Sequence, residues 1–377
     1  MAQRKRSGDM ARIKIVGVGG GGSNAVSRMS KENIQGAELI CLNTDAQALE
    51  RMDVPSKVRI GERLTKGLGA GGDPDLGRES AEESQDDILK AIRGADMTFI
   101  ATGMGGGTGT GGAPVIARVA KSTGALTVAV VTKPFTFEGQ KRRRLAEDGI
   151  RLLSEKVDTL ITVSNDRLLE LCDPSVSIMG AFSMVDDILC QGIQAISDVI
   201  TVAGEINVDF ADVRSIMADS GRALMAIGTG KGENRVGEAT EAVLSSPLLD
   251  TPIEGATGVL FNISGDDDLT LLEINKAAQL IGEAVNPEAE KIFGVVTDPK
   301  LNGEMRITLI ATGLGTDPMA HAFREEYRKL PVERSREAVP TASSTPDGPD
   351  KEGFSLDIPT FLRRRSSKGK EQNLRLV

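Results

Sequence analysis

Two glycine-rich segments constrain the fold of this chain more than any other feature of its sequence. The first, Gly-Val-Gly-Gly-Gly-Gly-Ser-Asn over residues 17–24, overlaps the end of the apolar run 12–18 and leads into a helical pattern. The second, Thr-Gly-Met-Gly-Gly-Gly-Thr-Gly-Thr-Gly-Gly over residues 102–112, lies between the apolar run 97–101 and the helical pattern 113–121. Glycine lets a backbone approach a ligand closely and adopt positive φ. Both segments therefore predict strand-to-helix turns whose amide groups bind an anion such as phosphate.

Short β-rich runs alternate with helical patterns from about residue 11 to residue 201. The expected strands are almost wholly apolar, as is usual when helices cover both faces of a parallel sheet. They are Arg12–Val18, Ala37–Leu42, Met97–Ala101, Leu126–Thr132 and Thr159–Val163. Helical periodicity is present between them, for example over Glu79–Arg93. The alternation predicts an α/β fold with a Rossmann-like, largely parallel sheet in a first domain over residues 11–174.

A long helical pattern follows this first domain. Residues 175–201 carry apolar side chains at three- and four-residue steps, which predicts an interdomain helix. A second, smaller α/β domain is expected over residues 202–316. Its expected elements are the helices Val236–Ser245 and Leu269–Ala284 and the strands Gly258–Ile263, Lys291–Val296 and Met305–Thr312.

The two ends of the chain have a different composition. Residues 1–10 are expected to be a flexible N-terminal segment, and residues 317–353, rich in Pro, Glu, Arg, Ser and Thr, predict a disordered linker. Residues 354–377 begin with the apolar island Phe-Ser-Leu-Asp-Ile-Pro-Thr-Phe-Leu-Arg-Arg-Arg. Such an island in a disordered tail is typical of a docking peptide. The last 17 residues carry six Lys or Arg and one Glu, so they favour an acidic partner or anionic lipid.

Composition excludes several classes of function. A net charge of −9 and an aromatic content of 3% argue against a general nucleic-acid binder, which needs a basic face and stacking platforms. Cys41, Cys172 and Cys190 are widely spaced, which favours a reducing compartment over disulfides or a zinc site. His321 is the single histidine, so catalysis is expected to use carboxylates, backbone amides or a metal-bound nucleotide. The start of the chain lacks the apolar core of a signal peptide, which predicts a cytoplasmic protein.

The first glycine segment by itself leaves other interpretations open. Gly17, Gly19 and Gly22 satisfy the GxGxxG pattern, and Asp45 follows at roughly the distance of a ribose-binding acid, so a dinucleotide-dependent oxidoreductase is one alternative. A tight turn without a ligand is another. The second segment favours a nucleotide, because two such loops can face one ligand and Thr108 adds a hydroxyl donor.

The residues 105–111, Gly-Gly-Gly-Thr-Gly-Thr-Gly, resemble the signature of the tubulin and FtsZ family of GTPases. The resemblance continues through the segments 43–45, 67–72, 133–139 and 207–212, in the same order as in that family. It implies a GTP-binding, self-assembling GTPase that uses GTP/GDP and Mg²⁺. It names no direct protein ligand for the metal, which is expected to be bound through the β and γ phosphates.

The resemblance also implies a set of nucleotide-binding residues. The phosphate loops would contain Gly20, Gly21, Gly22, Ser23, Asn24, Ala70, Gly71, Gly72, Gly105, Gly106, Gly107, Thr108 and Gly109. Glu138 and Arg142 would contact the ribose and the neighbouring phosphate, while Asn165 and Asp186 would read the guanine edge and Phe182 would pack on the base. One carboxylate can accept both adjacent N–H donors of guanine, which favours GTP over ATP. A surface salt bridge between Glu138 and Arg142, and a helix-surface charge at Asp186, remain the alternatives.

Asn207, Asp209 and Asp212 lie in one short segment and are the expected catalytic residues. An amide and two carboxylates suit the orientation of a water molecule near a metal-bound phosphate. In the family that this chain resembles, the segment completes the nucleotide site of the next subunit, so that hydrolysis requires head-to-tail assembly. The alternative is that Asp209 and Asp212 only cap the helix that begins near Asp212, in a scaffold that does not hydrolyse GTP.

The peptide Leu356–Arg365 resembles the family's tail that binds membrane-tethering cell-division proteins. Ile358, Phe361 and Leu362 have the spacing of helix-in-groove anchors. The implied partners are further copies of the chain and membrane-tethering and regulatory division proteins, with indirect membrane contact and no specific nucleic acid. The implied location is the cytoplasm at the division site, in the midcell ring. A paralogue outside division remains an alternative.

Overall fold

The computed structural model describes residues 11–32, 34, 36–172, 175–201 and 208–314, all within one compact unit. The N-terminal segment 1–10, Asn207, the linker 317–353 and the tail 354–377 lie outside the described residues. Among the described residues, no helix is both long enough and apolar enough to cross a membrane.

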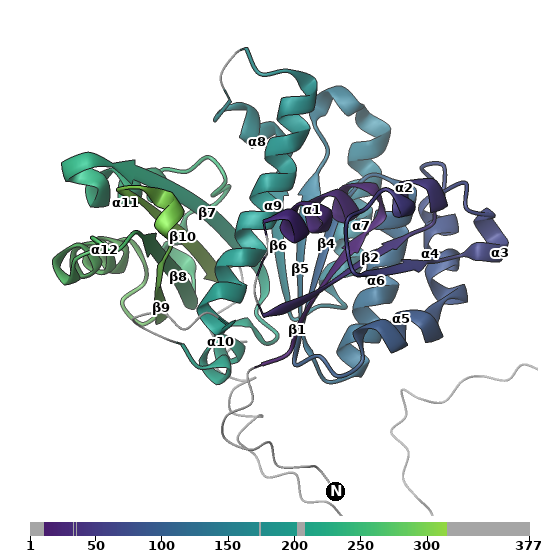
Figure 1. Ribbon diagram of the computed structural model, residues 1–377, viewed down its shortest axis with the longest axis horizontal. Coiled ribbons are helices and arrows are strands. Elements are labelled where there is room, and N and C mark those ends of the chain that lie inside the picture. Colours follow the sequence, from purple (N-terminus) through teal and green to yellow (C-terminus); the bar gives the residue numbers. More distant parts are fainter. Residues whose placement is uncertain (1–10, 33, 35, 173–174, 202–207, 315–377) are drawn as a thin grey trace, which may run out of the picture. The chain divides into compact units, whose positions relative to one another are not determined.

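A ten-stranded sheet forms the centre of the described chain, in the order β3-β2-β1-β4-β5-β6-β7-β10-β8-β9 (Figure 1). Its strands are β1 Ile13–Val18, β2 Ala37–Asn43, β3 Ser56–Arg59, β4 Met97–Gly103, β5 Leu126–Lys133, β6 Thr159–Ser164, β7 Gly221–Lys231, β8 Gly258–Gly265, β9 Glu290–Thr297 and β10 Glu304–Thr312. The strands from β3 to β7 pair in parallel. The expected parallel sheet is therefore confirmed.

The strand β7 is absent from the sequence-based prediction. It continues the parallel sheet through Gly221–Ala223 and then pairs antiparallel with β10, which is also antiparallel to β8. Its glycines explain the omission, because three of them in eleven residues suggest a turn. At Gly228 the absent side chain permits close packing, since a Cβ would lie 2.3 Å from the carbonyl oxygen of Ala239 on the neighbouring helix α11.

Helices cover the sheet on both faces. They are α1 Gly19–Lys31, α2 Ala46–Glu50, α3 Glu62–Thr65, α4 Pro74–Glu83, α5 Gln85–Ile92, α6 Gly107–Ser122, α7 Gln140–Ser154, α8 Asn165–Leu169, α9 Ile178–Thr201, α10 Phe210–Met217, α11 Arg235–Leu244 and α12 Leu271–Ala284. The long helix expected over residues 175–201 is α9. The helical periodicity over Glu79–Arg93 corresponds to the end of α4 and to α5, which are separated at Ser84.

Alternate side chains of β1 enter two different cores. Ile13 and Ile15 pack in a cluster with residues of α1, α9 and α10, whereas Val16 and Val18 pack in a cluster with residues of α5, α6 and α7. A third cluster fills the space between α11, α12 and the strands β7 to β10. Burial on both faces explains why the parallel strands are continuous apolar runs.

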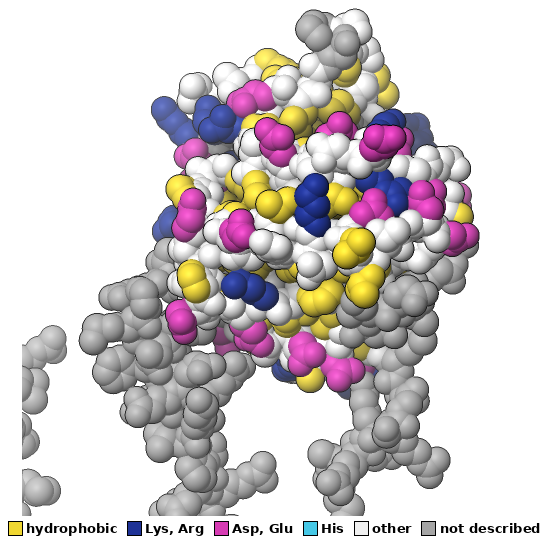
Figure 2. All heavy atoms as spheres, turned by 90° about the vertical axis from the view of Figure 1, so that its left-hand side faces the viewer, with side chains coloured by type: hydrophobic (Ala, Val, Ile, Leu, Met, Phe, Trp, Pro, Cys, Tyr) yellow, Lys and Arg dark blue, Asp and Glu magenta, His cyan; other side chains and the backbone are white. Residues whose placement is uncertain are grey.

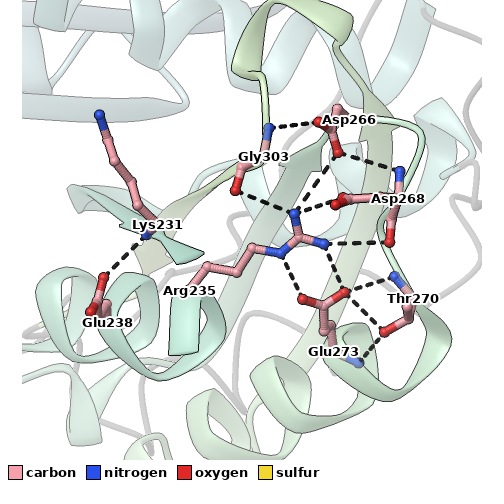
Figure 3. A network of polar contacts seen from close by, with 8 residues as sticks. All are labelled: Lys231, Arg235, Glu238, Asp266, Asp268, Thr270, Glu273 and Gly303. Carbon is pink, nitrogen blue, oxygen red and sulfur yellow. Dashed lines mark hydrogen bonds and ion pairs between the residues drawn. The ribbon is translucent and has the colours of Figure 1, made fainter. Parts of the chain in front are cut away.

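A buried arginine joins the loops of the C-terminal region. Arg235 of α11 makes a two-pronged contact with Glu273 of α12, with N···O distances of 2.6 and 3.0 Å, and pairs with Asp268 at 2.6 Å (Figure 3). Its guanidinium also donates to the carbonyl oxygen of Gly303. On the outer face of this region, acidic and basic side chains are interspersed (Figure 2).

Candidate functional site

A cavity of about 600 Å³ lies at the carboxyl ends of the parallel strands. This is the edge at which open α/β sheets bind ligands. Twelve of the predicted nucleotide-binding residues line it: Gly20, Gly21, Asn24, Gly106, Gly107, Thr108, Gly109, Glu138, Arg142, Asn165, Phe182 and Asp186. The two glycine segments and the distant helix α9 therefore face one space.

Two helix N-termini open into this cavity. The helix α1 begins at Gly19 and α6 begins at Gly107, so both glycine segments form the first turns of helices rather than separate loops before them. Neither Val18 nor Gly106, the residues before these helices, makes a side-chain capping hydrogen bond. The amide groups of the first turns are thus arranged to bind anionic oxygens, and the helix dipoles add to this attraction.

Some predicted loop residues hold the two segments together instead of lining the cavity. A Cβ at Gly22 would lie 2.0 Å from the carbonyl oxygen of Ala101, so only glycine lets α1 pack against β4. The side chain of Ser23 is fully buried, and a Cβ at Gly105 would lie 2.9 Å from the backbone of Arg142. Gly22, Ser23 and Gly105 do not line the cavity, and they fix the positions of the segments that do.

The segment Ala70–Gly72 lies beside the N-terminus of α6. A Cβ added at Gly107 would lie 2.8 Å from the Cβ of Ala70, which fixes how closely the two loops approach. Gly71 and Gly72 both have positive φ, and a Cβ added at either would meet no atom of the described chain within 4 Å. The segment is therefore adjacent to the cavity with an open backbone, although it does not line it.

The helix α9 supplies one wall of the cavity. Met179, Phe182, Ser183 and Asp186 line it at helical spacing. The ring of Phe182 packs edge-on against that of Phe135, with 5.5 Å between centroids. This leaves a partly exposed aromatic surface against which a flat base can stack.

Two polar groups at this end of the cavity are suited to a ligand with N–H donors. The Oδ1 atom of Asn165 is buried and has no hydrogen-bond partner among the residues that the structure describes. Burial raises the pKa of Asp186 to about 6, the charge of Arg28 opposes the shift, and the charge of Asp187 adds to it. An orphaned buried acceptor is costly unless a ligand satisfies it, so the arrangement fits the edge of a nucleobase.

Glu138 and Arg142 form the salt bridge that was the alternative to a ligand role, with 2.6 Å between Oε2 and Nη1. Glu138 also accepts a hydrogen bond from the backbone amide of Phe135 at 2.9 Å. Both side chains line the cavity nonetheless. The pair therefore presents a fixed carboxylate and a more exposed guanidinium at the cavity wall.

The predicted catalytic segment lies at the opposite edge of the sheet. Asp209 immediately precedes α10 and Asp212 is in its first turn, while Asn207 is outside the described residues. The helix α10 leads into Gly221, which pairs with Thr159 at the start of β6, and α10 lies beside the C-terminal end of α9 (Figure 1). The eight residues of β5 separate the two edges by about 25 Å, so Asp209 and Asp212 do not reach the cavity of their own chain.

Asp209 makes no side-chain capping hydrogen bond to α10. The alternative in which it serves only as a helix cap thus lacks the contact that defines a cap. A metal site made of protein groups alone is not present in the described part of the chain, where no three His, Cys, Asp or Glu side chains come together to hold a cation. Mg²⁺ bound with a nucleotide would take phosphate and water oxygens as ligands.

Sequence reasoning missed several residues that line the cavity. Thr132 and Pro134 lie at and just after the end of β5, and Met179 and Ser183 flank Phe182 on α9. The carboxyl end of an expected parallel strand was a usable signal for the first two. Helical steps of three and four residues from Asp186 were a usable signal for the others.

Comparisons with known proteins bear on the same regions. Residues 12–173 match the Tubulin/FtsZ family, GTPase domain, and residues 221–315 match the FtsZ family, C-terminal domain. Among solved structures, the chain is similar to the empty FtsZ dimer from M. jannaschii, with 43% sequence identity and a TM-score of 0.80. The match covers 82% of this chain and 90% of that one.

Two structures from Haloferax volcanii share the fold. The GDP-bound monomer of CetZ1 is 22% identical, with a TM-score of 0.70, and the match covers 83% of this chain and 98% of that one. The GTPγS-bound protofilament of CetZ2 is 20% identical, with a TM-score of 0.69, and the match covers 84% and 97%. At such identities the likeness concerns the fold alone.

Proposed function

This chain belongs to the Tubulin/FtsZ family of polymerising GTPases, and from that premise we propose that it hydrolyses GTP at the contact between head-to-tail subunits and forms the cytokinetic ring in bacterial cell division. Family membership removes the dinucleotide-dependent oxidoreductase as an alternative.

The observation that carries the shared site is the separation of its two halves. The nucleotide cavity opens at the carboxyl edge of the parallel sheet, whereas Asp209 and Asp212 lie at the amino edge. A second copy stacked in the same orientation would bring its amino edge to the cavity of the first. Such a contact repeats without closing, so it produces a filament. The structures of relatives include an FtsZ dimer and a CetZ2 protofilament, which supports self-association.

Exposed apolar side chains near the cavity support a subunit contact there. Met179 lines the cavity and is 79% exposed, and Ile178 beside it is 70% exposed. Phe137, which stacks on Phe135, is 62% exposed. Large apolar side chains gathered at one rim are typical of an interaction surface. A neighbouring subunit would bury them and exclude water from the nucleotide.

In the proposed reaction, the first-turn amides of α1 and α6 bind the phosphates and stabilise charge on their oxygens. Asp209 and Asp212 of the adjoining subunit orient the attacking water, and a carboxylate accepts its proton. Bound Mg²⁺ would neutralise phosphate charge, with phosphate and water oxygens as its ligands. Asp186 and Asn165 select the base, because a carboxylate accepts two adjacent N–H groups from guanine and adenine does not offer them.

We also propose that the tail peptide Leu356–Arg365 binds membrane-tethering and regulatory division proteins, which would bring the cytoplasmic filament to the midcell ring. The support is the apolar island and its basic end in the sequence. Deletion of residues 354–377 should leave polymerisation intact and abolish recruitment by a membrane adaptor in cells. Loss of polymerisation in the purified truncated protein would contradict this assignment.

The replacement Asp212→Asn tests the shared site. Nucleotide binding and sedimentation should remain close to those of the unchanged protein, while GTP turnover falls roughly 10²-fold or more. Asp86→Asn, on the exposed surface of α5, is the matched control and should retain full turnover. If Asp212→Asn abolished nucleotide binding together with turnover, Asp212 would belong to the fold or to the binding of nucleotide, and the shared-site assignment would fail.

A further inference from the structure

Arg28 connects the helix that carries the first phosphate loop to the helix that reads the base. It lies on α1, one turn after Asn24, and its Nε atom is 2.6 Å from Oδ1 of Asp187 on α9. Its Nη1 atom donates to the hydroxyl of Ser183, also at 2.6 Å. Asn24, Ser183 and Asp186 all line the nucleotide cavity, so this arginine holds both helices where they meet the ligand.

A second cavity, of about 530 Å³, is lined by Arg28. It shares Asn24 and Asp186 with the nucleotide cavity, and Arg28 is part of its wall. The remaining charged residues of its wall are Lys31, Glu32 and Arg51. Asp186 therefore borders both cavities, and Arg28 lines the second one.

The charges around Asp186 oppose one another. Burial raises the pKa of Asp186, Arg28 lowers it and the adjacent carboxylate of Asp187 raises it, with a net value of about 6. The pKa of Asp187 is also raised, first by burial and then by Glu32, and again lowered by Arg28. Across the second cavity Lys31 and Arg51 add positive charge at greater exposure. Arg28 is thus the cation that acts on both carboxylates.

We propose that Arg28 is a positioning residue for guanine recognition, which fixes the α9 face through Asp187 and Ser183 and keeps the Asp186 carboxylate able to accept two N–H groups from the base. The inference rests on the proposed function, because it presumes that the cavity binds a guanine nucleotide. Under this proposal, Arg28 helps to determine which base is bound although it does not contact the ligand.

A purely structural role for Arg28 leads to a different expectation. If the ion pair only held α1 against α9, its removal would weaken binding by the same factor at every pH. If it also acts on Asp186, its removal leaves two adjacent carboxylates without their cation, and Asp186 becomes harder to ionise. The loss of affinity should then be large near neutral pH and small in alkali.

The experiment measures GDP affinity of the full-length protein by calorimetry between pH 5.5 and pH 8.5, for the unchanged protein and for Arg28→Gln. GDP avoids turnover during the titration. Because affinity scales with the ionised fraction of Asp186, the higher pKa expected for Asp186 in Arg28→Gln should lower the affinity roughly tenfold at pH 7. The deficit should largely disappear at pH 8.5, so the midpoint of the affinity profile moves upward.

Two further variants separate charge from shape. Arg28→Lys retains the positive charge and should keep the midpoint near that of the unchanged protein. Lys31→Gln removes a charge from the same helix and the same cavity wall, and it should shift the midpoint much less. Circular dichroism at each pH checks that every variant is folded, and Arg28→Met, which removes the charge but keeps much of the side-chain length, replaces Arg28→Gln if that variant is not.

A second readout uses IDP, whose base lacks the exocyclic amino group of guanine. The unchanged protein should prefer GDP to IDP, and Arg28→Gln should reduce this preference at pH 7. An Arg28→Gln profile that is parallel to the unchanged one at all pH values, with an unaltered GDP-to-IDP ratio, would overturn the inference. Failure of the unchanged protein to prefer GDP to ADP would instead refute the proposed function, so the two failures are distinguishable.

Discussion

Two arginine–carboxylate groups, one at Arg235 and one at Arg28, show how this chain separates stability from binding. Arg235 is 6% exposed, and its guanidinium contacts Glu273, Asp268 and the carbonyl of Gly303 (Figure 3). Arg28 is about one-third exposed and pairs with Asp187, beside a cavity with an orphaned acceptor on Asn165. The partners of Arg235 all belong to the chain itself, so we call this group closed. The group at Arg28 lies beside an unsatisfied acceptor among the described residues, so we call it open.

The carboxylates of the two groups respond in opposite directions. The hydrogen bonds from Arg235 lower the pKa of Glu273 to about 2, because they favour its charged form. Burial raises the pKa of Asp186 to about 6, because removal from water disfavours its charged form. The contacts of Arg235 stabilise the folded chain. The polar groups beside Arg28 are instead expected to form hydrogen bonds with a bound nucleotide.

The largest effect is expected from Arg235→Ala. Removal of the buried guanidinium leaves the partly exposed carboxylate of Glu273 and the exposed carboxylate of Asp268 without their cation. This should lower the free energy of unfolding by about 3 kcal/mol, since hydrogen bonds to charged groups contribute about 1.5–3 kcal/mol. Urea unfolding followed by circular dichroism measures this. Arg222→Ala is the control, because Arg222 pairs with Asp250 at an exposed site, and should cost under about 1 kcal/mol. If the two variants lost the same free energy of unfolding, the group at Arg235 would contribute no more to stability than an ordinary surface pair.

The next largest effect is expected from Asp186→Asn, and it concerns binding. Loss of a charged acceptor for two N–H groups should weaken GDP binding roughly 10- to 100-fold at pH 7.5, since hydrogen bonds to charged groups contribute about 1.5–3 kcal/mol. Stability of the nucleotide-free protein should not fall. Above its unfolded pKa, ionised Asp186 disfavours the folded state, and this penalty increases between about pH 4 and pH 6.

Calorimetry with GDP and urea unfolding without it give the two readouts for Asp186→Asn. A large drop in the free energy of unfolding with unaltered GDP affinity would contradict this expectation. Asp186 would then stabilise the fold, as Glu273 does, and would not bind the nucleotide. Asp187→Asn is not a suitable control, since it removes the partner of Arg28.

The smallest effect is the pH dependence contributed by Glu273. Its folded pKa lies below its unfolded value near 4.5, so its stabilising contribution is present above pH 4.5 and is lost as the pH falls toward 2. One such group changes the unfolding free energy by at most about 1.4 kcal/mol per pH unit. In Glu273→Gln this part of the acid slope should be absent. An unaltered slope in urea titrations would show that other carboxylates account for the acid dependence.

Much of the fold was predictable from local patterns. The strands β1, β2, β4, β5 and β6 agree with the apolar runs in the sequence to within two residues, because burial on both faces requires such runs. The strand β7 was missed, since Gly221, Gly228 and Gly230 weaken the strand pattern, although Gly228 and Gly230 serve the packing of α11. The antiparallel direction of β10 depends on contacts between distant segments, which no local pattern contains.

The site was predictable where a motif is continuous in the sequence. The glycine segments predicted one wall of the cavity, but their sequence does not distinguish Gly20, which has open space beside it, from Gly22, which packs on Ala101. Met179 and Ser183 were missed because they line the cavity only through the orientation of α9, which turns one of its faces toward the cavity. The role of Arg28 depends on a contact between residues 159 positions apart, so it required the structure.

GTP hydrolysis per chain, measured against protein concentration with magnesium and alongside sedimentation, tests the central claim most directly. A site shared between the cavity of one subunit and α10 of the next predicts negligible turnover below a threshold concentration. Above the threshold, turnover per chain should rise together with the pelleted fraction. Constant turnover per chain from the lowest concentration upward, without polymer, would mean that each subunit contains a complete site, and it would contradict the account.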